Sequence, residues 1–177
     1  MLLDANQSQL LLIDYQARLM PAISGGEQVL ANAHRLGTLA RLLHIPVLGT
    51  EQTPAKLGAL VPAVGALCDE TITKNRFSAE HVLAAPLHAR GERRALVVAG
   101  CEAHVCLMQT ALDLNDADWA VWIVTDASGS RSPHNRDAAF ARLAAVGCRL
   151  ITTEMAGFEW LGDAEHDAFR AWQKMIR

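Results

Sequence analysis

Short, wholly apolar runs alternate along this chain with longer segments in which apolar residues recur every three or four positions. A run of four to six apolar residues between polar or turn residues is typical of a strand buried on both faces. Six such strands are predicted, at 9–14, 45–50, 71–74, 94–99, 120–125 and 148–152. Between the first two, Val29, Ala33 and Leu36 have the spacing of one helix face. This alternation indicates a parallel sheet covered by helices on both sides.

Capping and turn residues mark where the predicted helices begin. Ser78 precedes a helix expected to run towards residue 90, and Ser132-Pro133 opens the helix after the fifth strand. Serine is a favoured N-cap residue, and proline is favoured at the first helical position. A loop rich in proline and glycine is expected at 52–65, and a last helix should turn Trp172 inwards.

The 177 residues contain no repeat, low-complexity tract or linker, so one domain spanning 1–177 is predicted. We expect a three-layer α/β/α sandwich with the common doubly wound strand order 3-2-1-4-5-6. In that order the first and fourth strands are neighbours, and ligands bind beyond the carboxyl ends of the strands. Asp14 and Lys74 end the first and third strands, and Cys106 follows the fourth. The topology therefore predicts that these three residues meet in one crevice.

Cysteine, lysine and aspartate together suit acyl transfer. Cys106 lies where a helix is expected to begin, and the helix dipole there favours a thiolate. The ammonium group of Lys74 would lower the thiol pKa further. Asp14 could accept the thiol proton and later give it to a leaving amine, and N–H groups at the helix start could stabilise an oxyanion.

Four segments resemble the isochorismatase-like cysteine hydrolases, a family that includes nicotinamidases and N-carbamoyl-amino-acid amidases. They lie at 11–16, 73–78, 100–111 and 125–128, so the resemblance spans nearly the whole chain. Its most specific part is Cys106 followed by residues 109–111. The isochorismatase domain-containing branch is the most similar, because of residues 50–52 and 126–132.

The resemblance implies that Asp14, Lys74 and Cys106 are the catalytic residues. It also implies a non-proline cis peptide between Cys101 and Glu102, with the N–H groups of Glu102 and Cys106 forming the oxyanion hole. A further set of residues lies beside the predicted crevice and is expected to bind substrate, although packing alone would explain the last of them. These residues are Tyr15, Gln16, Gln52 and Phe77.

Departures from the family narrow the expected chemistry. Nicotinamidases place an Asp/His metal cluster in the region that corresponds to residues 51–60, where this chain has no histidine. Neither a metal nor another cofactor is therefore expected, and nicotinamide is disfavoured as the substrate. Isochorismatases that cleave a vinyl ether need no cysteine nucleophile. The presence of Cys106 instead favours hydrolysis of a small amide, carbamoyl or ester substrate.

Composition and charge indicate which classes of partner and which cellular location to expect. A net charge of −3 gives no support for binding to nucleic acid, and no apolar stretch approaches the length of a membrane span. The chain start does not read as a signal peptide, and four unevenly spaced cysteines do not read as a disulfide scaffold. A cytoplasmic location is predicted. Self-association is also expected, because homo-oligomers are common among compact α/β enzymes and the resemblance implies them.

Three alternative interpretations stay open at this point. The first is vinyl ether hydrolysis, with Asp14 as the acid and Cys106 incidental. The second is a non-enzymatic scaffold or thiol redox sensor, in which Cys101 is the resolving partner of Cys106. The third treats Cys101, His104 and Cys106 as metal ligands, although no second ligand pair has zinc-site spacing. Cys68 and Cys148 are expected to be ordinary buried thiols.

Overall fold

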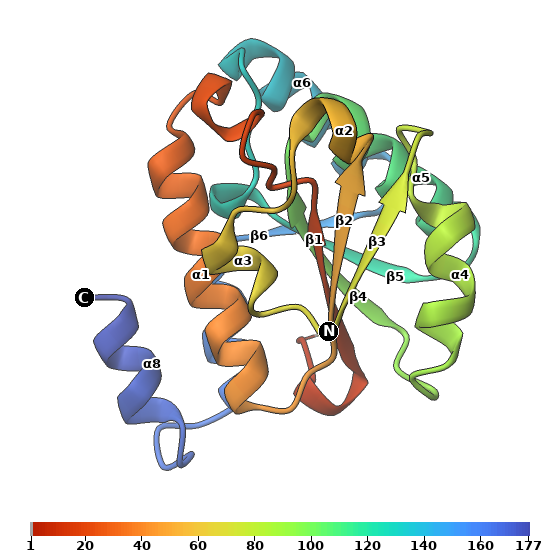
Figure 1. The fold of residues 1–177 in the computed structure, drawn as a ribbon. Helices are drawn as coiled ribbons and strands as arrows, with labels where there is room; N and C mark the ends of the chain where they lie inside the picture. The colour runs from red at the N-terminus through yellow and green to blue at the C-terminus, as the bar shows by residue number, and fades with distance from the viewer. Residues whose placement is uncertain (1) are drawn as a thin grey trace.

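One six-stranded parallel sheet forms the centre of the computed structural model, which describes residues 2–177 (Figure 1). The strand order is β3-β2-β1-β4-β5-β6, which confirms the predicted fold class and topology. The strands are β1 (Ser8–Ile13), β2 (Val47–Gln52), β3 (Glu70–Lys74), β4 (Ala95–Gly100), β5 (Ala120–Val124) and β6 (Arg149–Ile151).

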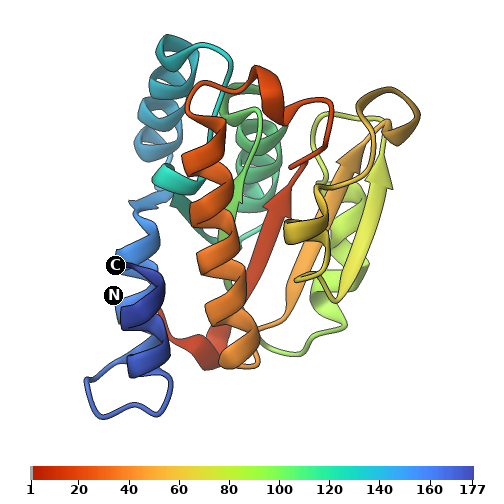
Figure 2. The ribbon, with the colours of Figure 1, turned by 60° about the vertical axis from the view of Figure 1, so that its left-hand side comes forward.

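Helices cover both faces of this sheet (Figures 1 and 2). One face carries α1 (Gly26–Leu42), α7 (Thr153–Leu161) and α8 (Phe169–Met175), and the other carries α4 (Glu80–His88), α5 (Met108–Asp116) and α6 (Pro133–Ala145). The remaining elements are single turns at the ends of strands and in loops. They are η1 (Ala5–Gln7), η2 (Met20–Ala22), α2 (Pro54–Leu57), α3 (Pro62–Gly65), η3 (Ala103–Leu107) and η4 (Thr125–Ala127).

The central strand β1 shows why the run at residues 10–13 is continuously apolar. Every residue of Ser8–Ile13 is buried. Successive side chains point to opposite faces of a strand. Leu10 and Leu12 accordingly pack in the core beneath α1, whereas Leu11 and Ile13 pack in the core beneath α4 and α5. Because both faces of this run pack in a core, the next polar residue, Asp14, comes only at the edge of the sheet.

The start of α4 differs from the sequence prediction. The N–H of Ala79 donates to Thr110 Oγ1 at 3.0 Å, and α4 begins only at Glu80. Ser78 therefore lies one residue outside the N-cap, where its hydroxyl accepts from the N–H of Glu80 at 3.3 Å. Ser132 occupies the N-cap of α6 and Pro133 opens the helix, as predicted, although the Ser132 side chain makes no capping bond. The loop expected at 52–65 contains two one-turn helices, each opened by a proline.

Helices α7 and α8 approach closely at Gly157, where a Cβ atom would overlap the indole ring of Trp172. Trp172 is fully buried, so its ring has little room to shift. We expect Gly157→Ala to lower the free energy of unfolding by about 1–3 kcal/mol, the usual cost of overpacking a core. Urea denaturation followed by tryptophan fluorescence measures this. The matched control is Gly65→Ala, because a Cβ atom there meets only Leu60, at an ordinary distance of 3.6 Å. Gly91→Ala would not serve, because Gly91 has a φ of +81°, which strains any other residue.

Among residues 2–177, no helix combines the length and the apolar character that crossing a bilayer requires. The four cysteines are all free thiols.

Candidate active site

Asp14 lies immediately after β1, at the carboxyl edge of the sheet, and its side chain is fully buried. Its backbone φ is +53°, a left-handed conformation that aspartate adopts more readily than most residues. The two carboxylate oxygens have different partners. Oδ1 accepts a hydrogen bond from Thr50 Oγ1 at 2.7 Å, and Oδ2 accepts from Lys74 Nζ at 2.7 Å. A buried carboxylate held in this way is fixed in both position and orientation.

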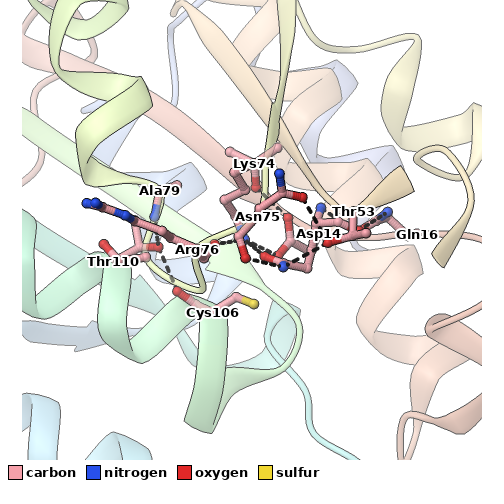
Figure 3. A network of polar contacts seen from close by, with 12 residues as sticks. Asp14, Gln16, Thr53, Lys74, Asn75, Arg76, Ala79, Cys106 and Thr110 are labelled. Atoms are coloured by element: carbon pink, nitrogen blue, oxygen red, sulfur yellow. Dashed lines mark hydrogen bonds and ion pairs between the residues drawn. The ribbon is translucent and has the colours of Figure 1, made fainter. Parts of the chain in front are cut away.

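Lys74 is the last residue of β3 and is also buried, with 4% of its surface exposed. Its ammonium group donates to Asp14 Oδ2 at 2.7 Å, to Gln52 Oε1 at 2.8 Å and to the carbonyl oxygen of Arg76 at 3.4 Å (Figure 3). Burying a charge is unfavourable unless it is paired and hydrogen-bonded. Here three acceptors surround the ammonium, and one of them carries the opposite charge.

Cys106 lies in η3, a short π-helical turn between β4 and α5. Its residue is 6% exposed, and its thiol interacts with both Asp14 and Lys74. In Figure 3 the sulfur lies beside the network formed by these two residues. The structure thus brings together the three residues that the sequence placed at separate strand ends. Turns of π-helix are rare and often found at functional sites.

The protonation state of Cys106 differs from the sequence expectation. Burial, and after it the negative charge of Asp14, raise the pKa of its thiol to about 12. Lys74 lowers the pKa, as expected, but does not outweigh burial. The expectation that the helix start and the lysine would favour a thiolate is therefore wrong for the resting protein. At neutral pH the resting group is a thiol, so a base must remove its proton during reaction.

Tyr15 and Gln16, expected to contact substrate, are both fully buried. The ring of Tyr15 packs in the core beneath α1, and its hydroxyl donates to the carbonyl oxygen of Ala127 at 2.5 Å. The side-chain amide of Gln16 donates to the carbonyl oxygens of Gln52 and Gly58, and its Oε1 accepts from the N–H of Gln52. The structure gives both side chains a role in holding the loops around the site.

Gln52 and Phe77, the other two expected substrate contacts, lie in very different surroundings. Gln52 is 9% exposed and is the amide that accepts from Lys74. Its Nε2 donates to the carbonyl oxygen of Asn75 at 2.8 Å. Phe77 is 52% exposed, three positions after Lys74. The structure therefore leaves Phe77 accessible to a ligand and ties Gln52 into the ion-pair network.

Thr50 belongs to the site but was not predicted from the sequence. Thr50 and Gln52 are two positions apart on β2, so their side chains point to the same face. One donates to Asp14 and the other accepts from Lys74. Polar residues that alternate at the carboxyl end of a buried strand are the signal that would have identified this pair.

The loop between β4 and η3 contains a cis peptide bond between Cys101 and Glu102. The N–H of Glu102 donates to no protein acceptor within residues 2–177, whereas the next N–H, of Ala103, donates to the carbonyl oxygen of Gly129 at 2.8 Å. Buried backbone N–H groups are nearly always paired, so an undonated N–H next to a candidate nucleophile is available to a ligand.

Burial is also the main cause of a raised pKa at the other three cysteines. Burial raises the pKa of Cys101 to about 12 and that of Cys68 to about 11, and it also raises the pKa of Cys148. Within residues 2–177, no three His, Cys, Asp or Glu side chains are grouped so as to hold a metal ion. His104 instead has its Nδ1 at 3.0 Å from Ser130 Oγ.

The sequence that builds this site is similar to known proteins along most of its length. Residues 8–155 match the family model of the Isochorismatase domain. The chain belongs to the isochorismatase family. It is 39% identical over 170 residues to isochorismatase domain-containing protein 2 of Macaca fascicularis, covering 96% of this chain and 83% of that protein. Identity to the human protein of the same name is 37% over 170 residues, with the same coverage.

Solved structures of family-like proteins have the same fold. The MAR1 ribonuclease of Caenorhabditis elegans superposes with a TM-score of 0.92 at 30% identity, covering 99% of this chain and 92% of that one. YcaC of Pseudomonas aeruginosa, solved with hexane-2,5-diol and covalent acrylamide, superposes with a TM-score of 0.89 at 26% identity, covering 99% and 95%. The isochorismatase family and its hydrolase fold are therefore shown for this chain.

Proposed function

We propose that this isochorismatase-family protein is a cysteine hydrolase that cleaves a small amide, carbamoyl or ester substrate through a thioester on Cys106. The observation that carries the proposal is the buried Asp14–Lys74 ion pair beside the Cys106 thiol, whose pKa both charges influence. A nucleophile within reach of a base, with the base oriented by further groups, is the usual arrangement for covalent catalysis.

The reaction begins with transfer of the thiol proton to Asp14 as the sulfur attacks the substrate carbonyl carbon. Lys74 keeps its proton, and its charge stabilises the thiolate as it forms. The N–H groups of Glu102 and Cys106 would donate to the developing oxyanion. Asp14 then gives the proton to the departing amine or alkoxide. Water, deprotonated by Asp14, hydrolyses the thioester, and the acid product leaves with the thiol restored.

The resting protonation state fits this sequence of steps. A thiol with a pKa of about 12 carries its own proton into the reaction, and the adjacent carboxylate is the group that can accept it. The covalent acrylamide in the Pseudomonas YcaC structure supports the presence of a reactive nucleophile in this fold, since acrylamide is an electrophile that thiols attack.

The test is an activity screen of the wild-type protein over primary amides, N-carbamoyl amino acids and small esters such as p-nitrophenyl acetate, with Cys106→Ala as the blank. We expect Cys106→Ala to reduce turnover at least about 10³-fold, and rapid acid quenching to trap an acyl adduct on Cys106 by mass spectrometry. The matched control is Cys148→Ala. It removes another buried thiol, one whose pKa is raised by burial and by Asp116 and not by Asp14.

Other outcomes of the same screen contradict the proposal. Full activity of Cys106→Ala on a vinyl ether would favour isochorismatase-type chemistry with Asp14 as the acid. Cleavage of RNA that survives Cys106→Ala would instead favour an activity like that in the name of the nematode relative. A Cys101–Cys106 disulfide under peroxide, with no turnover of any substrate, would favour a redox sensor.

We further propose that the protein self-associates and functions in the cytoplasm, as the sequence indicates. Several large apolar side chains are exposed on the single chain, including Met155 and Phe158 on α7. Light scattering coupled to size exclusion measures the subunit number, and a monomer at micromolar concentration would count against self-association.

A further inference from the structure

The segment that follows η4 makes hydrogen bonds to the loop between β4 and the Cys106 turn, on both sides of Glu102 and at Glu102 itself. We define this segment as the strap, residues 128–131. Its first contacts are to the end of β4: Ser128 Oγ accepts from the N–H of Gly100 at 3.2 Å, and the N–H of Gly129 donates to the carbonyl oxygen of Gly100 at 3.2 Å. On the far side of the cis peptide, the carbonyl oxygen of Gly129 accepts from the N–H of Ala103 at 2.8 Å.

The end of the strap binds the Glu102 side chain. The N–H of Arg131 donates to Glu102 Oε2 at 2.9 Å, and Arg131 Nε donates to Oε2 at 3.0 Å and Oε1 at 3.2 Å. The carboxylate is 9% exposed, whereas the arginine side chain is 65% exposed. One residue before Arg131, Ser130 Oγ lies 3.0 Å from His104 Nδ1. The strap thus fixes the residues before and after Glu102, and the Glu102 side chain itself.

The Glu102 N–H is the group that these contacts leave without an acceptor. If Glu102 turned about its flanking bonds, this N–H would move relative to the Cys106 sulfur. Such a movement would matter, because a donor to an oxyanion must be placed within a few tenths of an ångström. A carboxylate held by three hydrogen bonds from two donors of one neighbouring residue resists such a turn.

We propose that Glu102 and Arg131 are positioning residues: their ion pair, at the end of the strap, aims the Glu102 N–H at the oxyanion of the acyl-transfer reaction. The inference rests on the proposed function, since it assigns a role to residues around the same nucleophile. Neither side chain contacts the reacting atoms in this role. Glu102 acts through its own backbone, and Arg131 acts through Glu102.

The test compares four variants of the full-length protein with p-nitrophenyl acetate as the probe substrate. In Arg131→Ala we expect kcat to fall about tenfold with KM within about twofold of wild type, because the oxyanion exists only in the transition state. Glu102→Ala should lose about 100-fold in kcat. Glu102→Gln should retain most activity, because its amide oxygen still accepts from the Arg131 N–H. Arg136→Ala, which breaks the exposed Arg136–Asp137 pair on α6, should match wild type.

A second measurement separates positioning from general damage. Alkylation of Cys106 by iodoacetamide is a displacement at a saturated carbon and forms no oxyanion. Its rate should therefore stay within about twofold of wild type in Arg131→Ala, even though kcat falls. A parallel drop in alkylation and kcat would overturn the inference, because it would mean that the thiol environment had changed.

The inference and the proposed function fail with different signatures. Wild-type kcat in both Arg131→Ala and Glu102→Ala, together with an inactive Cys106→Ala, would overturn the inference alone. Hydrolysis of the probe that persists in Cys106→Ala, or no hydrolysis by the wild type, would overturn the proposed function and the inference with it.

Discussion

Replacing Asp14 with asparagine should speed up alkylation of Cys106 while it abolishes turnover. The charge of Asp14 and its hydrogen bond both raise the pKa of the Cys106 thiol, whereas Lys74 lowers it. Without the carboxylate, the thiolate fraction at pH 7.5 rises, and iodoacetamide should label Cys106 at least about tenfold faster, the change expected for one pKa unit. Turnover should fall by about 10²–10⁴-fold, the usual contribution of a general base.

The pH dependence of Cys106 alkylation tests the same role of Asp14. Because the pKa of Cys106 is raised to about 12, the wild-type alkylation rate should rise about tenfold per pH unit between pH 7 and pH 9. The Asp14→Asn curve should be displaced to lower pH. Peptide mass spectrometry, which resolves Cys106 from the other thiols, measures both rates. Asp113→Asn, an exposed carboxylate on α5, is the matched control and should change neither alkylation nor turnover. Slower labelling in Asp14→Asn would refute the role assigned to the carboxylate.

Lys74→Met should destabilise the fold as well as the site. It leaves the fully buried Asp14 carboxylate without its ammonium partner, and breaking a buried ion pair from one side costs about 3–5 kcal/mol. For a chain of this length, that loss lowers the melting temperature by roughly 6–20 °C. Scanning calorimetry and urea denaturation measure it. Cys106 labelling should slow, the opposite of the Asp14→Asn result, because Lys74 lowers the thiol pKa.

The double variant Asp14→Asn/Lys74→Met tests whether the cost comes from the unpaired charge. It buries no charge at this position, so it should recover much of the stability that Lys74→Met loses. Lys174→Met removes an exposed lysine from the last turn of α8 and should change stability by less than about 0.5 kcal/mol. If the double variant were as unstable as the sum of the two single variants, the ion pair would not be the cause.

Much of this architecture could be predicted because buried parallel strands leave a clear pattern in a sequence. The run Leu10 to Ile13 could only be a strand that serves two cores, and the polar residue after it had to lie at the sheet edge. Once the strand order is the doubly wound one, Asp14, Lys74 and Cys106 converge without any knowledge of their side-chain contacts.

The side chains around that edge were harder to predict. Regular alternation would place Tyr15 on the same face as Ile13, but it packs with Leu10 and Leu12 instead. The left-handed backbone at Asp14 interrupts the alternation, and no pattern of apolar residues reports such a conformation. The raised pKa of Cys106 could not be predicted from the sequence either, because desolvation depends on how tightly neighbouring segments close over the sulfur.

The burial of Cys106 bears on which reagents could inhibit the protein. A sulfur that keeps its proton at rest and is almost covered should react slowly with peroxide, maleimides and other soft electrophiles, because these reagents react with preformed thiolates. Reactive carbonyl compounds such as small lactones or activated carbamates suit it better, because they develop negative oxygen as the bond forms and can use the base and donors already in place. Slow-turnover acylating agents should therefore block this protein faster than general thiol traps do.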